Sequence, residues 1–212
     1  MPFPKAVLLD LDGTLLDTER VYQAAWKKAA TEIGYPLSEE RVLSLRSLDR
    51  RIADTYFQAW FGDVEIGKKI RALREECMKD MVVLAKPGAR ELGLFLQSKG
   101  IPFCVCSASP YSSIKDKLDK GGIGDVFTNL FSARDVPHGK PEPDVYLAAC
   151  KSLGIEPKEA IAIEDAPNGF QSALSAGLSV IYSVDLTEPD EFISSHAYKV
   201  VHCLREVLSL FE

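Results

Sequence analysis

Short apolar runs alternate with amphipathic stretches over most of this chain. Five runs have the length and composition of buried β-strands: Ala6–Leu9, Ile101–Cys106, Ala160–Ile163, Leu178–Val184 and Lys199–Val201. Between the later runs, the pattern is typical of helices over Gly88–Ser98, Asp144–Leu153 and Asn168–Ala176. Strands that alternate with helices predict βαβ units, and therefore an α/β fold with a mainly parallel sheet and helices on both faces.

After the first run, a long interval follows a different pattern. It is poor in strand-like runs and rich in helix formers, with turn signals at residues 34–36 and 61–63. We therefore expect a small all-helical cap domain, residues 17–85, inserted after the first strand and placed over the sheet. The remaining residues, 1–16 and 86–212, are expected to form the catalytic core.

Two clusters in the expected cap each allow two interpretations. An aromatic cluster with helical spacing is more typical of a packed interior than of a surface that contacts substrate; it contains Tyr56, Phe57, Trp60 and Phe61. A basic cluster is interleaved with glutamates, which favours a solvated helix face over an anion-binding patch; its cations are Lys68, Lys69, Arg71 and Arg74.

Composition and charge limit the partners and substrates that the protein is expected to bind. The chain has 212 residues, a formal net charge of -6 and five cysteines without metal-ligand spacing. An acidic chain repels nucleic acids and anionic membranes, so we expect neither as a partner. The absence of a signal-peptide pattern favours a cytoplasmic protein, which we expect to act as a monomer. A small phosphorylated substrate would need positive charge supplied locally by its site.

Polar residues follow several expected strands directly, and in an open parallel sheet the carboxyl ends of the strands meet at the ligand site. The first strand runs into Asp10 and Asp12, and Gly13 then ends it. Two acids so placed are costly to bury without a cation or a shared proton. One carboxylate could attack phosphorus to form an aspartyl-phosphate, while the other could protonate the leaving oxygen and later deprotonate water. The pair therefore predicts an active site rather than a solvated turn.

Two further clusters could bind a phosphoryl group. Ser107 and Ala108 close the second strand, where a hydroxyl and backbone N–H groups would form a phosphate site or an ordinary helix cap. Lys140 lies in the sequence Gly-Lys-Pro-Glu-Pro-Asp, where prolines stiffen the backbone. A fixed ammonium could bind the phosphoryl group and the attacking carboxylate together. The alternative for Lys140 is a proline-rich turn that leads into a helix.

A fourth cluster, Glu164 and Asp165, ends another apolar strand. Mg²⁺ takes oxygen ligands, usually one or two carboxylates together with phosphate and water. Asp10, the backbone carbonyl of Asp12, and Asp165 with Glu164 in support would form such a site. The metal would attract an anionic substrate into an acidic protein, so the sequence predicts Mg²⁺ as the cofactor.

Taken together, these residues resemble the haloacid dehalogenase superfamily. Its four motifs appear in order as DLDGT at residues 10–14, a strand-ending serine at 107, a lysine at 140 and an acidic pair at 164–165. The resemblance spans nearly the whole chain, and it implies a Rossmann-like core with a helical cap inserted after the first motif. The cap position and the continuation LLDTE are similar to the subfamily of β-phosphoglucomutase and related small-molecule phosphatases.

The resemblance also implies roles for individual residues. It makes Asp10 the nucleophile and Asp12 the general acid/base, and it assigns phosphate binding to Ser107 and Lys140. It implies a Mg²⁺ site formed by Asp10, Asp12, Glu164 and Asp165. Dehalogenases of the superfamily lack an aspartate at the place of Asp12, so this residue points to phosphate-ester chemistry.

Two departures from the mutase pattern favour hydrolysis over transfer to a sugar. Tyr22 stands where β-phosphoglucomutase has a histidine, and Leu48 stands at the place of a cap arginine, for which Arg46 could substitute as a substrate-binding residue. We therefore predict a Mg²⁺-dependent phosphatase of small phosphorylated metabolites such as sugar phosphates, with a sugar-phosphate mutase as the alternative. A sensor without catalysis is disfavoured because both aspartates, the lysine and the acidic pair are all present.

Overall fold

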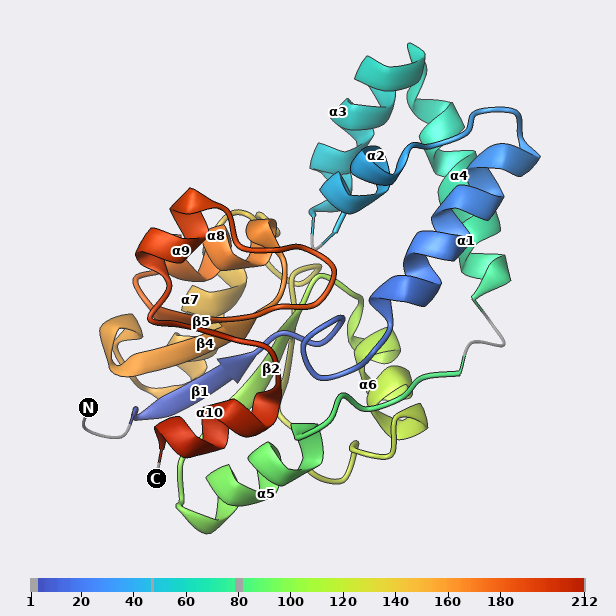
Figure 1. The fold of residues 1–212 in the computed structure, drawn as a ribbon. Helices are drawn as coiled ribbons and strands as arrows, with labels where there is room; N and C mark the ends of the chain where they lie inside the picture. Colours follow the sequence, from blue (N-terminus) through green and yellow to red (C-terminus); the bar gives the residue numbers. More distant parts are fainter. Residues whose placement is uncertain (1–3, 47, 79–81, 212) are drawn as a thin grey trace.

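The computed structural model describes residues 4–46, 48–78 and 82–211. Within these residues, six parallel strands form one sheet: β1 (Ala6–Leu9), β2 (Phe103–Ser107), β3 (Leu130–Ser132), β4 (Ala160–Glu164), β5 (Ser179–Ser183) and β6 (Lys199–Val201). Their order in the sheet is β3-β2-β1-β4-β5-β6, so the first strand lies in the middle of the sheet (Figure 1). The predicted α/β fold with a parallel sheet is confirmed.

The five predicted strands are all present, and the prediction missed only the short edge strand β3 among the strands described. Its three residues pair with the end of β2, from Val105 opposite Leu130 to Ser107 opposite Ser132. Two of the three residues are only half-buried, and a strand of three residues is too short to give a continuous apolar run. An edge strand of this length has too little buried surface to be recognised from its composition.

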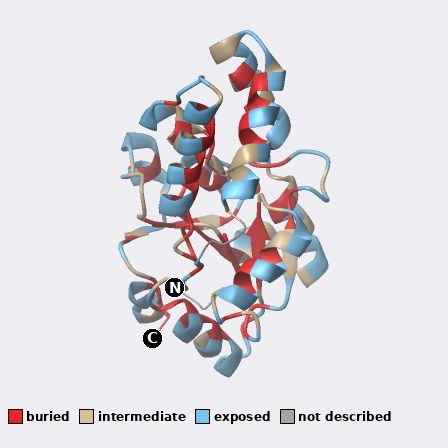
Figure 2. Cartoon of the chain, turned by 90° about the vertical axis from the view of Figure 1, so that its right-hand side faces the viewer, coloured by how far each residue is buried: buried red, intermediate tan, exposed pale blue. Residues whose placement is uncertain are grey.

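Helices cover both faces of the sheet, and the pleat of β1 shows why. Val7 and Leu9 belong to one apolar cluster, whereas Ala6 and Leu8 belong to the other, because successive side chains point to opposite faces. The first face is covered by α5 (Ala89–Ser98), α6 (Tyr111–Lys120) and α10 (Leu204–Leu210). The second face is covered by α7 (Asp144–Leu153), α8 (Pro167–Ser175) and α9 (Glu191–His196). The strands are accordingly buried on both sides (Figure 2).

Four helices lie together beyond the carboxyl end of β1 (Figure 1): α1 (Glu19–Glu32), α2 (Glu39–Ser44), α3 (Arg50–Phe61) and α4 (Val64–Cys77). We refer to them as the helical unit. The expected break between α3 and α4 has a local cause, because Gly62 adopts a left-handed conformation and Asp63 caps α4 through the Glu65 N–H. No described helix has the length and apolar character needed to cross a membrane.

The helical unit has an apolar interior of its own. Phe57 is fully buried at its centre, where its ring lies 5.9 Å from Trp26. Tyr56, Trp60 and Phe61 pack against this cluster, and their rings contact each other or Phe57. The interpretation of the aromatic cluster as a packed interior is therefore confirmed.

Replacing Phe57 by alanine tests this interior. We expect Phe57→Ala to lower the free energy of unfolding by about 3–5 kcal/mol, because it removes a buried ring and leaves a cavity. Trp26 and Trp60, the only two tryptophans, both belong to the helical unit, so urea unfolding followed by tryptophan fluorescence reports on this unit. Tyr111→Ala, at a half-exposed position on α6, is the control and should change the midpoint little. Similar losses in both variants would contradict the assignment.

Candidate active site

Three carboxylates meet where β1 and β4 end. Asp10 follows β1, while Glu164 closes β4 and Asp165 follows it. The two strands are neighbours in the sheet, and the Asp10 N–H donates to the Ile163 carbonyl at 3.0 Å. Oxygen atoms of the three carboxylates consequently lie within 4.8 Å of one another, and all three residues are buried. The structure thus brings together three of the four residues predicted to hold a metal.

Lys140 binds two of these three carboxylates. Its ammonium lies 2.6 Å from Asp10 Oδ1 and 2.5 Å from Glu164 Oε1, and it donates to the Cys106 carbonyl at 2.9 Å. Its side chain is fully buried, so these contacts replace its hydration. The Tyr146 hydroxyl also donates to Glu164 Oε1, at 2.5 Å. The predicted juxtaposition of Lys140 with Asp10 is present; a contact between Lys140 and phosphate stays a prediction.

The single ammonium leaves excess negative charge in this cluster. Burial, together with the charge of Glu164, raises the pKa of Asp10 to about 8, although Lys140 opposes the shift. Burial also raises the pKa of Asp165. Asp10 Oδ2 and Glu164 Oε2 are buried and have no hydrogen-bond partner among the described residues. An additional cation would satisfy both atoms, so the donor set fits a hard divalent ion such as Mg²⁺.

The turn after β1 positions Asp165, the carboxylate of the cluster that Lys140 does not bind. Gly13 has a φ of 91°, which favours glycine, and a Cβ atom at this residue would overlap the Asp165 carboxylate. The Thr14 hydroxyl donates to Asp165 Oδ1 at 3.1 Å. The Asp-x-Asp-Gly-Thr sequence therefore folds so that its backbone packs directly against Asp165, which follows β4.

Asp12 lies outside the carboxylate cluster. Its side chain accepts hydrogen bonds from Lys117 Nζ at 2.6 Å, Thr18 Oγ1 at 2.7 Å and Ser109 Oγ at 3.3 Å. Burial raises the pKa of Asp12, but the charge and hydrogen bond of Lys117 act together with hydrogen bonds from Thr18 and Tyr22 in the opposite direction, so the net shift is downward. The carboxylate of Asp12 is therefore separate from the candidate metal ligands, and only its backbone carbonyl is left to contribute to that site as predicted.

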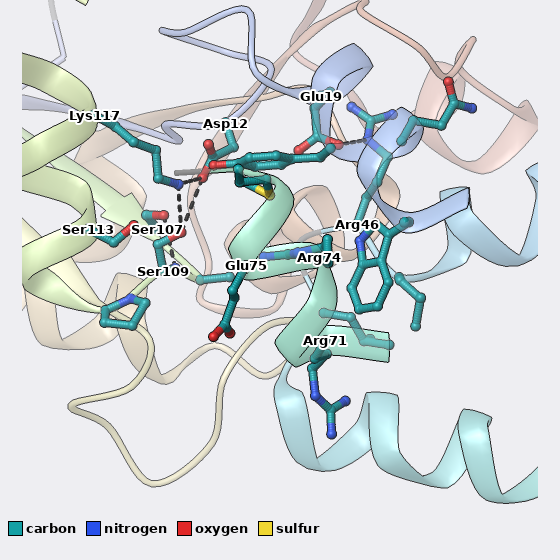
Figure 3. A pocket seen from close by; sticks show the side chains of 18 of the residues that line it. Asp12, Glu19, Arg46, Arg71, Arg74, Glu75, Ser107, Ser109, Ser113 and Lys117 are labelled. Atoms are coloured by element: carbon teal, nitrogen blue, oxygen red, sulfur yellow. Dashed lines mark hydrogen bonds and ion pairs between the residues drawn. The ribbon is translucent and has the colours of Figure 1, made fainter. Parts of the chain in front are cut away.

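A cavity of about 680 Å³ opens above these residues, between the core and the helical unit. Asp10 and Asp12 lie in its wall together with Ser107 and Ala108, the two residues predicted to bind phosphate. The Ser107 hydroxyl is buried and accepts from the Ser109 N–H at 3.1 Å. Figure 3 shows the polar end of this cavity, where Lys117 connects Asp12 with Ser109.

Arg46 links the helical unit to the core. Its guanidinium donates to Glu19 Oε2 at 3.0 Å, to Thr187 Oγ1 at 2.7 Å and to the Asp165 carboxylate. Burial raises the pKa of Glu19 to about 7, although Arg46 opposes the shift. Arg46 also lines the cavity, yet three of its nitrogens are bound to protein oxygens. Its predicted contact with substrate stays a prediction.

Two charged residues close to the site were missed by the sequence prediction. Lys117 lies on the buried face of α6 beside Ile114 and Leu118, and a lysine in an apolar stripe was a usable signal. Asp185 follows the strand β5, the same strand-end signal that identified Asp10, and it pairs with Lys86 at 2.7 Å.

The solvated-face interpretation of the basic cluster in α4 is wrong for two of its residues. Lys68 and Lys69 are exposed, but Arg71 is buried, Arg74 is half-buried, and both line the cavity. The two pairs separate because they lie on different faces of the same helix.

Comparison with known proteins agrees with this geometry. Residues 4–177 match the haloacid dehalogenase-like hydrolase family. Hexitol phosphatase A of Escherichia coli is 34% identical over 84% of this chain and 82% of its own length. The phosphorylated carbohydrates phosphatase of Thermotoga maritima is 28% identical over 85% of both chains. A haloacid dehalogenase family hydrolase from Deinococcus radiodurans, solved with bound phosphate and sodium, superposes with a TM-score of 0.75 at 26% identity, over 98% of this chain and 94% of that one.

These matches define the class of protein. The chain belongs to the haloacid dehalogenase-like hydrolases, and the two curated relatives above are phosphatases. The family resemblance inferred from the four motifs is therefore confirmed.

The charge excess predicts an unusual dependence of stability on pH. A carboxyl group whose pKa is raised in the folded protein stabilises it below about pH 4 and loses this contribution as the pH rises through the folded pKa, about 8 for Asp10. Without divalent cations, we expect the free energy of unfolding to fall between pH 6 and pH 8, by up to about 1.4 kcal/mol per pH unit. Mg²⁺ should raise the melting temperature more at pH 8 than at pH 6. A melting temperature that rises with pH in chelator would contradict this account.

Gly13 offers a test of the packing around Asp165. Gly13→Ala imposes a strained φ and an overlap with the Asp165 carboxylate, whereas Gly34→Ala imposes strain alone, at a φ of 82° with nothing within 4 Å. We expect both variants to lose about 1–2 kcal/mol of stability from strain. Only Gly13→Ala should weaken Mg²⁺ binding, measured by calorimetry. Equal Mg²⁺ affinities in the two variants would exclude this role of Gly13.

Proposed function

We propose that this protein is a Mg²⁺-dependent phosphatase that hydrolyses small phosphorylated metabolites, such as sugar phosphates, through an aspartyl-phosphate. The observation that carries the proposal is the position of Asp10. It lines the cavity, its carboxylate is held by the buried Lys140, and it lies within reach of two further carboxylates. The activities named for the relatives, which act on hexitol phosphates and phosphorylated carbohydrates, agree with this assignment.

The reaction has two halves in this proposal. In the first, a carboxylate oxygen of Asp10 forms a bond to phosphorus while the bond between phosphorus and the ester oxygen breaks, and Asp12 donates a proton to the departing oxygen. In the second, Asp12 removes a proton from water as the water oxygen attacks phosphorus, and the bond to Asp10 breaks to release inorganic phosphate. Lys140 stabilises the negative charge around Asp10 in both halves.

The environment of Asp12 is suited to its part in the second half. Lys117 holds the pKa of Asp12 low, so the free enzyme carries Asp12 as a carboxylate that can act as a base. A phosphate dianion bound beside it raises this pKa, because a neighbouring like charge disfavours ionisation. Substrate binding therefore promotes the protonation that Asp12 needs to act as an acid.

The carboxylates of Asp10, Glu164 and Asp165 would hold the Mg²⁺ ion, with the Asp12 carbonyl as a further oxygen. When bound, the ion would lower the pKa values of these groups and neutralise charge on the phosphoryl oxygens. Ser107 and the backbone of Ala108 are proposed to contact the phosphoryl group from the β2 side. Arg46 is proposed to contact the substrate from the helical unit.

We further propose that residues 17–85 act as a cap over a core made of residues 1–16 and 86–212. The cavity between them has a volume typical of sites for small molecules. In this arrangement the sheet carries the reacting groups, while the helical unit contacts the part of the substrate that leaves. The proposed substrates are therefore small molecules, and the proposed acceptor of the phosphoryl group is water.

Release of inorganic phosphate from a panel of sugar phosphates tests the proposal. Wild-type protein with Mg²⁺ should release phosphate, and Asp10→Asn should lower the rate at least about a thousandfold because the nucleophile is lost. Asp119→Asn, at an aspartate paired with Lys115 on the surface, is the matched control and should keep full activity. Activity retained by Asp10→Asn in a pure preparation would refute the mechanism. Formation of an isomerised sugar phosphate without free phosphate would identify a mutase instead.

A further inference from the structure

One cavity-lining arginine of the helical unit has no part in the proposed reaction. Arg74 lies on α4, with its guanidinium carbon 4.7 Å from the ring centroid of Trp26 and 5.4 Å from that of Tyr22. Its Nε is buried without a hydrogen-bond partner. Burial lowers the pKa of Arg74, although the charges of Tyr22 and of nearby acids, Glu75 foremost, oppose the shift. Within the described ranges, none of these acids forms an ion pair with Arg74 at 4 Å or less. The positive charge is therefore held in the cavity wall at a cost in stability.

Arg71, one turn earlier on α4, adds a second positive charge with buried N–H groups. One of its terminal nitrogens contacts Asp54, but its Nε and Nη1 are buried and have no partner in the part of the chain that the structure describes. An arginine that only packs against aromatic rings usually keeps its N–H groups in water. Here, N–H groups of two arginines are removed from water on the side of the helix that lines the cavity.

Arg74 lies on the side of the cavity where the leaving group must be. The ring centroid of Tyr22 is 5.2 Å from Lys117 Nζ, and Lys117 pairs directly with Asp12. Arg74 is thus one aromatic ring away from the cation that binds the proposed proton donor (Figure 3). Because Asp12 acts on the ester oxygen, the organic part of the substrate extends from Asp12 toward the helical unit.

Two further arginines add positive charge at the cavity wall. Arg50 on α3 and Arg134 after β3 both line the cavity and are exposed. Burial lowers the pKa of Arg134, and although the charge of Asp49 opposes this shift, the charges of Arg50 and Arg71 add to it. Like charges that converge on one space destabilise the empty protein, and an anion bound between them removes the repulsion.

We propose that the preferred substrate is a small phosphomonoester whose organic part carries a second anionic group, a carboxylate or another phosphate, and that Arg74 binds this group. The proposal rests on the phosphatase function proposed above. The guanidinium of Arg74 offers N–H donors to a planar carboxylate or to phosphate oxygens, and such charge-assisted hydrogen bonds are the strong ones. A neutral polyol at the same place would leave the positive charge uncompensated. Arg74 is then a specificity-determining residue.

Binding is measured without turnover, by calorimetry on the Asp10→Asn variant with Mg²⁺. Three open-chain ligands differ only at one end: glucitol 6-phosphate is neutral there, 6-phosphogluconate has a carboxylate, and glucitol 1,6-bisphosphate has a second phosphate. We expect one anionic ligand or both to bind at least about tenfold more tightly than glucitol 6-phosphate. The ligand that gains more identifies the second group as carboxylate or phosphate.

Variants of Arg74 separate recognition from packing. Arg74→Met, which keeps contact with the aromatic rings, should lose most of the tenfold preference, with a much smaller change for the neutral ligand. Arg74→Lys should keep part of the preference. Arg41→Met is the matched control, because Arg41 lies 5.2 Å from the Trp60 ring and outside the cavity wall, and the preference should persist. The melting temperature of Arg74→Met should not fall, since the substitution removes a half-buried guanidinium whose Nε is buried without a hydrogen-bond partner.

Two results would overturn the inference. Equal affinity of the parent protein for all three ligands would show that no second anion is recognised. An equal loss of affinity for charged and neutral ligands in Arg74→Met would assign Arg74 a packing role. Failure of the proposed function is seen separately, as the absence of phosphate release by wild-type protein from any of the three compounds.

Discussion

The buried ammonium of Lys140 is the interaction on which the site depends. Asp10 and Glu164 end neighbouring strands, so the parallel sheet necessarily brings their charges together. Without a cation, burying both would cost several kcal/mol, and one of them would have to remain protonated. Lys140 holds the two ends at hydrogen-bonding distance while leaving Asp10 accessible from the cavity. The fold supplies the rigidity, and the lysine offsets part of the negative charge, which leaves the remainder for an additional cation.

A second constraint concerns the contact between the sheet and the helical unit. Arg46 reaches from the helical unit to Asp165, while Tyr22 lies between Lys117 of the core and Arg74 of α4. The proposed nucleophile and the candidate metal ligands Glu164 and Asp165 lie where β1 and β4 end, and backbone hydrogen bonds of the sheet fix them there. The groups proposed to face the leaving part of the substrate belong to helices with an apolar interior of their own. This division allows the helices to vary in sequence without disturbing the chemistry at the sheet.

The strand-end residues could be predicted from the sequence because their position follows from local pattern alone. An apolar run that ends in acidic residues indicates a buried strand and also a candidate active site at its carboxyl end, as at Asp10 and Glu164. Lys117 could not be placed in the same way, since its contact with Asp12 is made by tertiary packing across 105 positions of the chain. Arg71 and Arg74 were misjudged because the cluster was treated as one face of α4, although the two arginines lie three residues apart on the cavity side.

The chain carries a formal net charge of -6, yet its cavity must admit anions. The acids of the site have cationic partners, whereas one of its cations has no acidic partner. This difference explains how an acidic protein can admit an anion. Asp10 and Asp12 are bound to lysines, whereas Arg74 has no acidic partner in the residues described. In the proposal above, the energy spent on keeping such a charge unpaired in the free protein would be recovered when a complementary anion binds. Selectivity can then come from the helical unit, because the strand-end groups would bind the phosphoryl group of every phosphomonoester equally.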